Sequence, residues 1–382
     1  MLRLERIQVK GFKSIESLDV DLQSLNVLIG ANGAGKSNFL DLFRLLSHIF
    51  RQKLQLFVGL AGGAERLLHF GRKVTERMQI ELKFSSCTYQ CELVPASGDQ
   101  LIFAHEAISY HDSNGSVPAY VDLGGGHSES KLNLARPQEA HLDSWPKWAK
   151  RLVHTVGSWR VYHFHDTSDS AKVKVTGDID DNRFLRPDGS NLAAILYLLQ
   201  QTQPAYYQDI VGTIRLVAPF FDDFVLQPSL LNPNKIKLEW RQKGSESYFD
   251  AYTLSDGTLR FITLATLLLQ PVIQSSFLQS INSTKDLPII LLDEPELGLH
   301  PYAIGLLADL LSEAATRTQV VVSTQSVTLV EQFAPEDIIV VEHTEGQSCF
   351  KRLVADHMAL WLEEYSLGEL WEKNILGGRP LS

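Results

Sequence analysis

Apolar and polar residues alternate through much of the first third of the chain, a pattern typical of β-strands with one solvated face. Residues 1–29 are expected to form strands, with aspartates between the apolar residues from 18 to 22. Residues 78–84 and 89–93 alternate in the same way and predict a hairpin. This part of the chain is therefore expected to build an antiparallel sheet.

The same region contains residues that favour turns and loops. The pair Asn114-Gly115 predicts a second hairpin. The Gly/Ser-rich stretch from Gly124 to Ser130 predicts a mobile loop. Cys87 and Cys91 lie in a strand-like segment without clustered histidines, so we interpret them as core thiols rather than metal ligands.

Helical spacing of apolar residues begins after residue 38 and returns over 190–217 and 259–270. Strand-like alternation at Ile236, Leu238 and Trp240 separates the last two segments. From Ile289 to Leu292 the chain is continuously apolar, as in a strand buried on both faces. Further helices and strands alternate after it, so the pattern as a whole predicts an α/β fold.

A candidate phosphate-binding motif lies directly before the first helical pattern. Residues 30–37 read Gly-Ala-Asn-Gly-Ala-Gly-Lys-Ser and fit the phosphate-binding pattern G-x-x-x-x-G-K-[ST] between a strand and a helix. Glycines let the backbone approach the phosphates closely, and the helix N-terminus attracts negative charge. Lys36 is expected along the β- and γ-phosphates, and Ser37 is expected to bind Mg²⁺. The expected contact residues are Asn32, Gly33, Ala34, Gly35, Lys36, Ser37 and Asn38.

Two carboxylates end the buried apolar strand, in the sequence Leu292-Asp293-Glu294-Pro295. Ligands of open α/β sheets bind at the carboxyl ends of strands. Asp293 is placed to hold Mg²⁺, and Glu294 is placed to polarise an attacking water. The alternative is that the pair only caps the following helix.

A third motif, Leu254-Ser255-Asp256-Gly257-Thr258, precedes the apolar helix from Leu259. A serine and a glycine at a helix N-terminus can form an anion site. They are also what an ordinary N-cap requires, and composition alone favours that simpler interpretation.

Composition limits the class of protein. The chain has 382 residues, a formal net charge of −10 and three cysteines. The negative charge gives no support for broad nucleic-acid binding, although a local basic groove is compatible with it. No apolar run reaches the roughly 18 residues that a membrane span needs, and the N-terminus has no signal-like apolar segment. Few cysteines favour a reducing compartment, so we expect a cytoplasmic protein that contacts no membrane.

Together the motifs resemble the head of ABC-type ATPases. A phosphate loop, an LSGGQ-like element and an apolar strand ending Asp-Glu-Pro occur in that order. The start Val9-Lys10-Gly11-Phe12-Lys13-Ser14 and the run from Asp293 to Pro301 are similar to the RecF, SMC and OLD-like branch rather than to transporters. We expect neither long coiled-coil arms nor the nuclease domain of OLD proteins in this chain, because the sequence has no long heptad run and the segment from Lys351 is short.

The resemblance implies a P-loop NTPase of the ABC-ATPase head type, with a mixed sheet core, an antiparallel β lobe and a helical lobe. It also implies ATP and Mg²⁺ as ligands and a dimer of heads around two nucleotides. Ser255 and Gly257 would then contact the γ-phosphate held by the opposite subunit, while Lys13 and Ser14 would lie near the nucleotide. The segment from Glu296 to His300 would line the dimer interface.

Four segments are expected on this basis. Residues 1–180 would hold the phosphate loop and the β-rich lobe, and 181–284 the helical lobe with the signature element. Residues 285–345 would complete the ATPase core, and 346–382 would form a helical tail.

This chain departs from the family at two places. Gln325 stands where a switch histidine is expected, and glutamine can hydrogen-bond but cannot carry a proton's charge, so slow hydrolysis is expected. The Mg²⁺-sensing loop is also unclear. Its best candidate is Tyr162–Thr167, in which Asp166 would face the metal. His163 and His165 share a strand face beside it, so a dedicated metal site and a plain structural role remain open alternatives.

Three functions are compatible with these motifs. The first is an ATP-hydrolysing RecF-like head that acts in DNA repair or phage defence, with DNA and an effector or nuclease protein as candidate partners. The second is a transporter ATPase subunit, which the long β-rich insertion argues against. The third is a nucleotide-gated clamp or scaffold with little turnover, which Gln325 motivates.

Overall fold

The computed structural model describes residues 2–110, 119–132, 147–271 and 289–378. The chain divides into two compact units that interleave along the sequence. The first unit contains Met1–Val161, Asp286–Leu291 and Ala334–Ser382, and the second contains Tyr162–Lys285 and Leu292–Phe333. The expected four-segment division stays a prediction.

The first unit is built on an antiparallel sheet with the strand order β2-β1-β4-β5-β6-β7. Its strands are β1 (Leu4–Phe12), β2 (Ile15–Asp21), β4 (Met78–Phe84), β5 (Cys87–Ala96), β6 (Gln100–Tyr110) and β7 (Ala119–Gly124). Ile7 pairs with Val20 on one side and with Leu82 on the other, and all three side chains are buried. Inward-facing apolar residues thus set the register, because a slip by one residue would turn them to solvent. The expected N-terminal strands and the first hairpin are confirmed.

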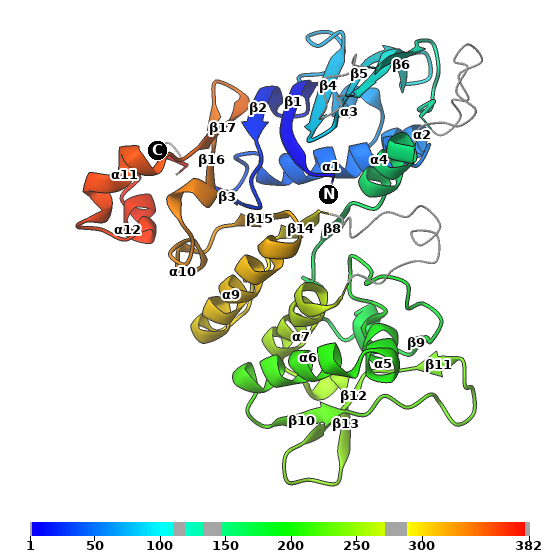
Figure 1. Ribbon diagram of the computed structural model, residues 1–382, viewed down its shortest axis with the longest axis vertical. Coiled ribbons are helices and arrows are strands. Elements are labelled where there is room, and N and C mark those ends of the chain that lie inside the picture. Colours follow the sequence, from blue (N-terminus) through cyan, green and yellow to red (C-terminus); the bar gives the residue numbers. More distant parts are fainter. Residues whose placement is uncertain (1, 111–118, 133–146, 272–288, 379–382) are drawn as a thin grey trace. The chain divides into compact units, whose positions relative to one another are not determined.

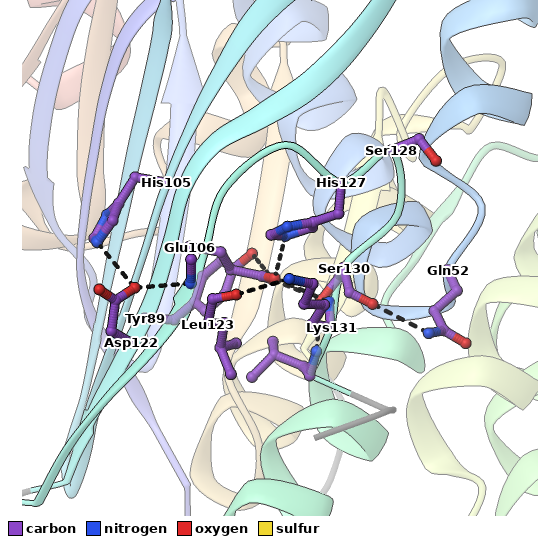
Figure 2. Close-up of polar contacts among 12 residues, drawn as sticks. Gln52, Tyr89, His105, Glu106, Asp122, Leu123, His127, Ser128, Ser130 and Lys131 are labelled. Atoms are coloured by element: carbon purple, nitrogen blue, oxygen red, sulfur yellow. Dashed lines mark hydrogen bonds and ion pairs between the residues drawn. The ribbon is translucent and has the colours of Figure 1, made fainter. Parts of the chain in front are cut away.

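Strands β6 and β7 pair as the second expected hairpin, whereas its turn signal Asn114-Gly115 lies outside the described residues. The loop after β7 is hydrogen-bonded rather than free, contrary to the expected mobile loop. Glu106 on β6 is fully buried and accepts hydrogen bonds from Tyr89 Oη at 2.9 Å and Ser130 Oγ at 2.6 Å. His127 Nε2 lies 2.9 Å from the same carboxylate (Figure 2). A buried carboxylate needs such partners, and here the loop supplies two of them.

Helix α1 (Lys36–Phe50) covers one face of this sheet (Figure 1). Its buried face carries Phe39, Phe43 and Phe50 at helical spacing, as the sequence predicted. The Phe50 ring centroid lies 4.8 Å from that of Tyr89 on β5, an edge-to-face contact. Three further helices belong to this part: α2 (Leu54–Leu60), α3 (Ala64–Leu67) and α4 (Lys147–Gly157).

Three further strands of the first unit lie side by side in the order β17-β16-β3. They are β3 (Leu25–Ile29), β16 (Ile338–Thr344), which is preceded by the 3-10 helix η3 (Pro335–Asp337), and β17 (Gln347–Arg352). Strand β3 is entirely buried and runs parallel to β16, with Leu28 opposite Ile339. The expected helical tail of residues 346–382 therefore begins with a strand that pairs with β16, and helices follow only at α11 (Ala355–Leu362) and α12 (Leu367–Glu372).

The second unit is mainly helical. Helix α7 (Asp256–Leu269) lies against α6 (Pro204–Val217) and α9 (Pro301–Arg317), and α5 (Leu192–Thr202) packs beside them (Figure 1). The expected helices over 190–217 and after Gly257 are confirmed. Almost every residue of α7 from Leu259 to Leu268 is buried, which explains its continuous apolar sequence.

Short strands accompany these helices in two small sheets. The strands are β9 (Gly177–Asp178), β10 (Phe221–Phe224), β11 (Lys235–Ile236), β12 (Glu239–Gln242) and β13 (Tyr248–Asp250), with 3-10 helices η1 (Lys172–Lys174) and η2 (Ala251–Thr253). The alternation at Ile236, Leu238 and Trp240 predicted one strand. The structure divides it between β11, which pairs with β9, and β12, which pairs with β10 and β13.

The buried strand predicted at 289–292 is β14 (Ile290–Asp293). It lies between β15 (Val320–Thr324) and the short β8 (Arg160–Tyr162) in the strand order β15-β14-β8. Strand β15 is fully buried and leads into the short helix α10 (Val327–Val330). Strand β14 ends at Asp293 and β15 ends at Thr324, so polar residues lie at both strand ends.

Candidate nucleotide-binding site

The phosphate loop joins β3 to α1 in the first unit, as the sequence predicted. Gly33 and Gly35 have φ values of +78° and +116°, a region that side chains with a Cβ rarely adopt. A Cβ on Gly35 would lie 2.0 Å from Ser348 Oγ on β17, so glycine is also required for the close approach. Asn32 and Gly33 are exposed, whereas Ala34 is buried and anchors the loop through its N–H to Ala31 O at 3.2 Å.

Helix α1 begins directly at the loop. Among the described residues no side chain caps its N-terminus, because Gly35 occupies the cap position. The positive end of its dipole therefore lies at the loop and favours a bound anion. Lys36 is buried and donates from Nζ to Gly30 O at 2.6 Å and to Ala31 O at 3.0 Å. Ser37 is exposed in the first turn.

A polar cluster flanks the loop. Ser14 Oγ accepts from Asn38 Nδ2 at 2.6 Å and lies 2.7 Å from Ser348 Oγ. Lys13 Nζ forms an ion pair with Asp41 on α1 at 2.5 Å. The structure thus brings Lys13, Ser14 and Asn38 beside the loop, as the family resemblance implied. Ser348 was missed, since it lies on a strand that carries no motif.

The C-terminal part of the chain also reaches the loop. Ala31 N donates to Gly378 O at 2.6 Å, and Gly378 N donates to Glu342 Oε1 at 2.9 Å. The segment after α12 therefore fixes the first turn of the phosphate loop. Nothing in the local sequence of either segment predicts this contact.

The carboxylates after β14 lie in the second unit. Asp293 accepts a short hydrogen bond from Ser323 Oγ on β15. Glu294 follows with φ +45°, a strained value for a residue with a side chain, and its N–H donates to Ser323 O at 2.9 Å. Gln325 Nε2 donates a short hydrogen bond to Glu294 Oε1. The structure therefore places Asp293, Glu294 and Gln325 together at adjoining strand ends.

A second glutamate, Glu296, is buried next to this group. Its Oε1 accepts from Thr324 Oγ1 at 2.5 Å and from Gln325 N at 3.2 Å. Its Oε2 has no hydrogen-bond partner among the described residues. Burial raises the pKa of Glu296 above its ordinary value, and the charge of Glu294 acts in the same direction.

Ser255 is the N-cap of α7: its Oγ accepts from Thr258 N at 3.2 Å and lies 2.8 Å from Thr258 Oγ1. The N-cap interpretation is therefore confirmed, and the exposed Ser255 side chain is compatible with an additional anion contact. A Cβ on Gly257 would lie 2.6 Å from Gly298 O, so this glycine permits close packing against the segment after β14.

Arg260 connects three segments of the second unit. Its Nη1 donates to Leu297 O at 2.7 Å, and its Nη2 donates to His165 O at 2.8 Å and Thr167 Oγ1 at 3.4 Å. His165 Nε2 donates in turn to Asp293 O at 3.1 Å. Helix α7 is thereby linked to the residues around Asp293. Sequence reasoning missed Arg260, although a charged residue two positions after the third motif, in an apolar helix, was a signal.

The polar residues of the segment Tyr162–Thr167 contact neighbouring groups of the protein. Within the ranges described, no group of three or more His, Cys, Asp or Glu residues is arranged to hold a metal ion. Asp166 accepts hydrogen bonds from Ser168 N at 3.1 Å and Ser168 Oγ at 2.7 Å, and these lower the pKa of Asp166. The ring centroids of His163 and His165 lie 6.3 Å apart, and His165 contacts Asp293 O through its ring and Arg260 through its backbone carbonyl. A Mg²⁺ role for Asp166 stays a prediction.

Comparisons with known proteins agree with these features. Residues 140–331 match the family described as "AAA domain, putative AbiEii toxin, Type IV TA system", and residues 2–122 match an AAA ATPase domain. The DNA replication and repair protein RecF of Vibrio atlanticus (strain LGP32) is 26% identical over 203 residues, a match covering 44% of this chain. The chain spans 56% of the length of that relative.

Solved SMC head domains share the fold. A head bound to the C-winged helix domain of ScpA has a TM-score of 0.53 at 15% identity and covers 93% of this chain and 99% of its own. A Pyrococcus furiosus head with an extended coiled coil, bound to the C-terminal domain of ScpA, has the same TM-score and identity, with coverages of 95% and 99%. The expected fold class, a P-loop ATPase head with an antiparallel lobe and a mixed core, is confirmed.

Across the described residues, no helix is both long and apolar enough to cross a bilayer. The matching ATPase domain carries the loop described above and implies nucleotide binding. Motifs, fold and family match therefore lead to one conclusion: this chain belongs to the AAA domain family that matches residues 140–331, with distant sequence similarity to RecF and the fold of SMC heads.

Proposed function

We propose that this protein binds ATP with Mg²⁺, hydrolyses it slowly and dimerises around the bound nucleotide. The observation that carries the hydrolysis step is the hydrogen bond from Gln325 to Glu294 at the end of β14. It presents the Glu294 carboxylate in a fixed orientation, on a backbone held in a strained conformation. Strain of this kind is concentrated at functional sites.

Each residue of the proposed site has a defined role. The α1 N-terminus and Lys36 neutralise the phosphates, and Ser37 and Asp293 offer the hard oxygen ligands that Mg²⁺ prefers. Mg²⁺ would supply electrostatic stabilisation of the charge that develops on the transferred phosphoryl group. Glu294 accepts a proton from the attacking water.

Gln325 explains why turnover is proposed to be slow. Its amide can donate to Glu294 or to the γ-phosphate, but it cannot exchange a proton as an imidazole does. The Ser323 hydroxyl donates a hydrogen bond to Asp293 Oδ1, which fixes the orientation of that carboxylate.

Dimerisation follows from the composite site that the family resemblance implies. Ser255 is exposed at the N-terminus of α7, and Leu297, whose carbonyl accepts from Arg260 of the same helix, is also exposed. In a sandwich of two copies, the Ser255 hydroxyl and the Gly257 region would contact the γ-phosphate bound by the opposite copy. This arrangement makes ATP the ligand that joins the two heads.

The biological role we propose is DNA repair or phage defence. The family description, with its toxin–antitoxin term, supports defence, and the RecF relative supports repair. DNA and an effector or nuclease protein are the proposed partners. A second function, a nucleotide-gated clamp with little turnover, is favoured by the glutamine at position 325.

Two variants separate these proposals. Lys36→Ala should abolish ATP binding in titration calorimetry, because it removes the charge that balances the phosphates. Glu294→Gln should retain ATP binding, lose turnover and accumulate an ATP-bound dimer on sizing columns. Wild-type protein that binds ATP but shows no turnover with Mg²⁺, DNA and partner proteins present would establish the clamp instead of the enzyme. Unchanged binding by Lys36→Ala would refute the nucleotide site itself.

A further inference from the structure

Phe70 is an exposed aromatic residue in a conformation that aromatic residues avoid. Its φ is +51°, and its side chain is 64% exposed. For a bulky residue this left-handed conformation costs about 1–2 kcal/mol. Because the ring is largely exposed, burial of apolar surface offsets little of that cost. The local fold must therefore hold Phe70 in place, and its position calls for a functional explanation.

The backbone around Phe70 is tied to the turn that carries Lys13. Lys13 N donates to Leu67 O at 2.8 Å, and His69 N donates to Gly11 O at 3.2 Å. His69 Nδ1 lies 2.7 Å from Lys13 O, so the imidazole is fixed to the same turn. The Phe70 ring meets the His69 ring edge-on, with centroids 4.4 Å apart. These contacts fix where the aromatic ring projects.

The ring projects beside the phosphate loop. The tip of the Phe70 ring would be 2.9 Å from a Cβ built on Gly346, so it packs over the turn between β16 and β17. Two residues further, Ser348 contacts Gly35 and Ser14. Because two strand residues span about 7 Å, the ring and the loop flank the same short piece of chain.

An open cavity of about 630 Å³ lies at this place. It is lined by the charged residues Lys13, Glu65 and Arg66 and by Phe70. Lys13 adjoins Ser14, which is hydrogen-bonded to Asn38 at the start of α1. The cavity and the phosphate loop are therefore connected through the adjoining residues Lys13 and Ser14, and Phe70 lies at the cavity beside charged side chains.

We propose that Phe70 stacks on the base of the nucleotide whose phosphates occupy the loop at residues 30–37. The inference rests on the proposed nucleotide binding and extends it to the base. Stacking needs only the face of an aromatic ring, and it tolerates different bases because every base has a π-face. The cavity is therefore a base subsite that strengthens binding of both ATP and GTP without selecting strongly between them.

The test compares ligands with and without a base. Wild type, Phe70→Ala and Phe70→Tyr are titrated with ATP, GTP and inorganic tripolyphosphate by calorimetry. Phe70→Ala should weaken ATP and GTP by about tenfold or more, the range of base–aromatic stacking, and leave tripolyphosphate affinity unchanged. Phe70→Tyr should retain wild-type affinity for all of them.

Val74→Ala is the matched control, since Val74 is 65% exposed close by but does not line the cavity. Equal ATP affinity of wild type and Phe70→Ala would overturn the base subsite while leaving the phosphate site intact. A parallel loss of tripolyphosphate affinity would also overturn it, because the effect would then arise from the loop. Wild type that binds neither ATP nor tripolyphosphate would instead refute the proposed function.

Discussion

Arg260 offers the sharpest test of how the second unit is held together. Lysine at this position can reach one acceptor, whereas the guanidinium serves Leu297 O, His165 O and Thr167 Oγ1 at once. Arg260→Lys therefore leaves at least one carbonyl without its donor. An unsatisfied, partly buried carbonyl costs about 1–3 kcal/mol, and the lost charge-assisted bond adds to it. We expect a local destabilisation of about 2–3 kcal/mol.

Hydrogen exchange measures that loss locally. The amides of Leu297 and Leu299 donate to Glu294 O at 3.2 Å and Glu296 O at 3.0 Å, so they report opening of the segment after β14. A cost of about 2 kcal/mol corresponds to roughly 30-fold faster exchange at these amides. If the protein hydrolyses ATP as proposed, Arg260→Lys should also lower ATP turnover. Its affinity for ATP should equal that of wild type.

Arg215→Lys is the control for this experiment. Arg215, on helix α6, also donates to a carbonyl: its Nε lies 2.9 Å from Asp222 O on β10. Among the described residues, its contacts do not include Leu297 or His165. It should leave exchange at Leu297 and Leu299 unchanged. Wild-type exchange rates in Arg260→Lys would refute the claim that this guanidinium fixes the segment.

Two further predictions concern buried positions. Because the folded pKa of Glu296 is raised, its contribution to stability is full below the ordinary value of 4.5 and is lost as pH rises through the folded pKa. Glu296→Gln should thus raise the unfolding temperature at neutral pH, by a margin that shrinks toward pH 4.5; a margin constant with pH would contradict this. Gly35→Ala forces a Cβ within 2.0 Å of Ser348 Oγ and should destabilise by about 1–3 kcal/mol more than Gly33→Ala, whose Cβ meets nothing within 4 Å. Denaturant midpoints check this order, and Ser348→Gly should restore much of the difference.

The sequence predicted those parts of the site that local chemistry determines. The loop at 30–37 needs glycines and a following helix, and the strand ending at Asp293 needs continuous apolar residues. Each requirement is visible within about ten residues, so both elements are where the pattern placed them. The same holds for the N-cap role of Ser255, which a serine before an apolar helix indicates.

Contacts between distant segments were not predictable. Ser348, Arg260 and Gly378 contribute through the packing of strands and helices that are far apart in the sequence. Strand β17 was mistaken for part of a helical tail because Gln347–Arg352 is largely polar and half exposed at the edge of its sheet. The loop at 124–130 was expected to be mobile because its glycines and serines are visible in sequence, whereas the burial of Glu106 is not.

The hydrogen bond from Ala31 to Gly378 has a consequence for how the protein is made. These residues are 347 positions apart, the difference between 378 and 31. At about 5–20 residues per second, a ribosome needs roughly 20–70 s to synthesise the chain between them. Strand β16, the parallel neighbour of β3, also emerges late. The nascent phosphate loop therefore lacks its contact with Gly378 until about 347 further residues have been synthesised, so its final geometry forms late.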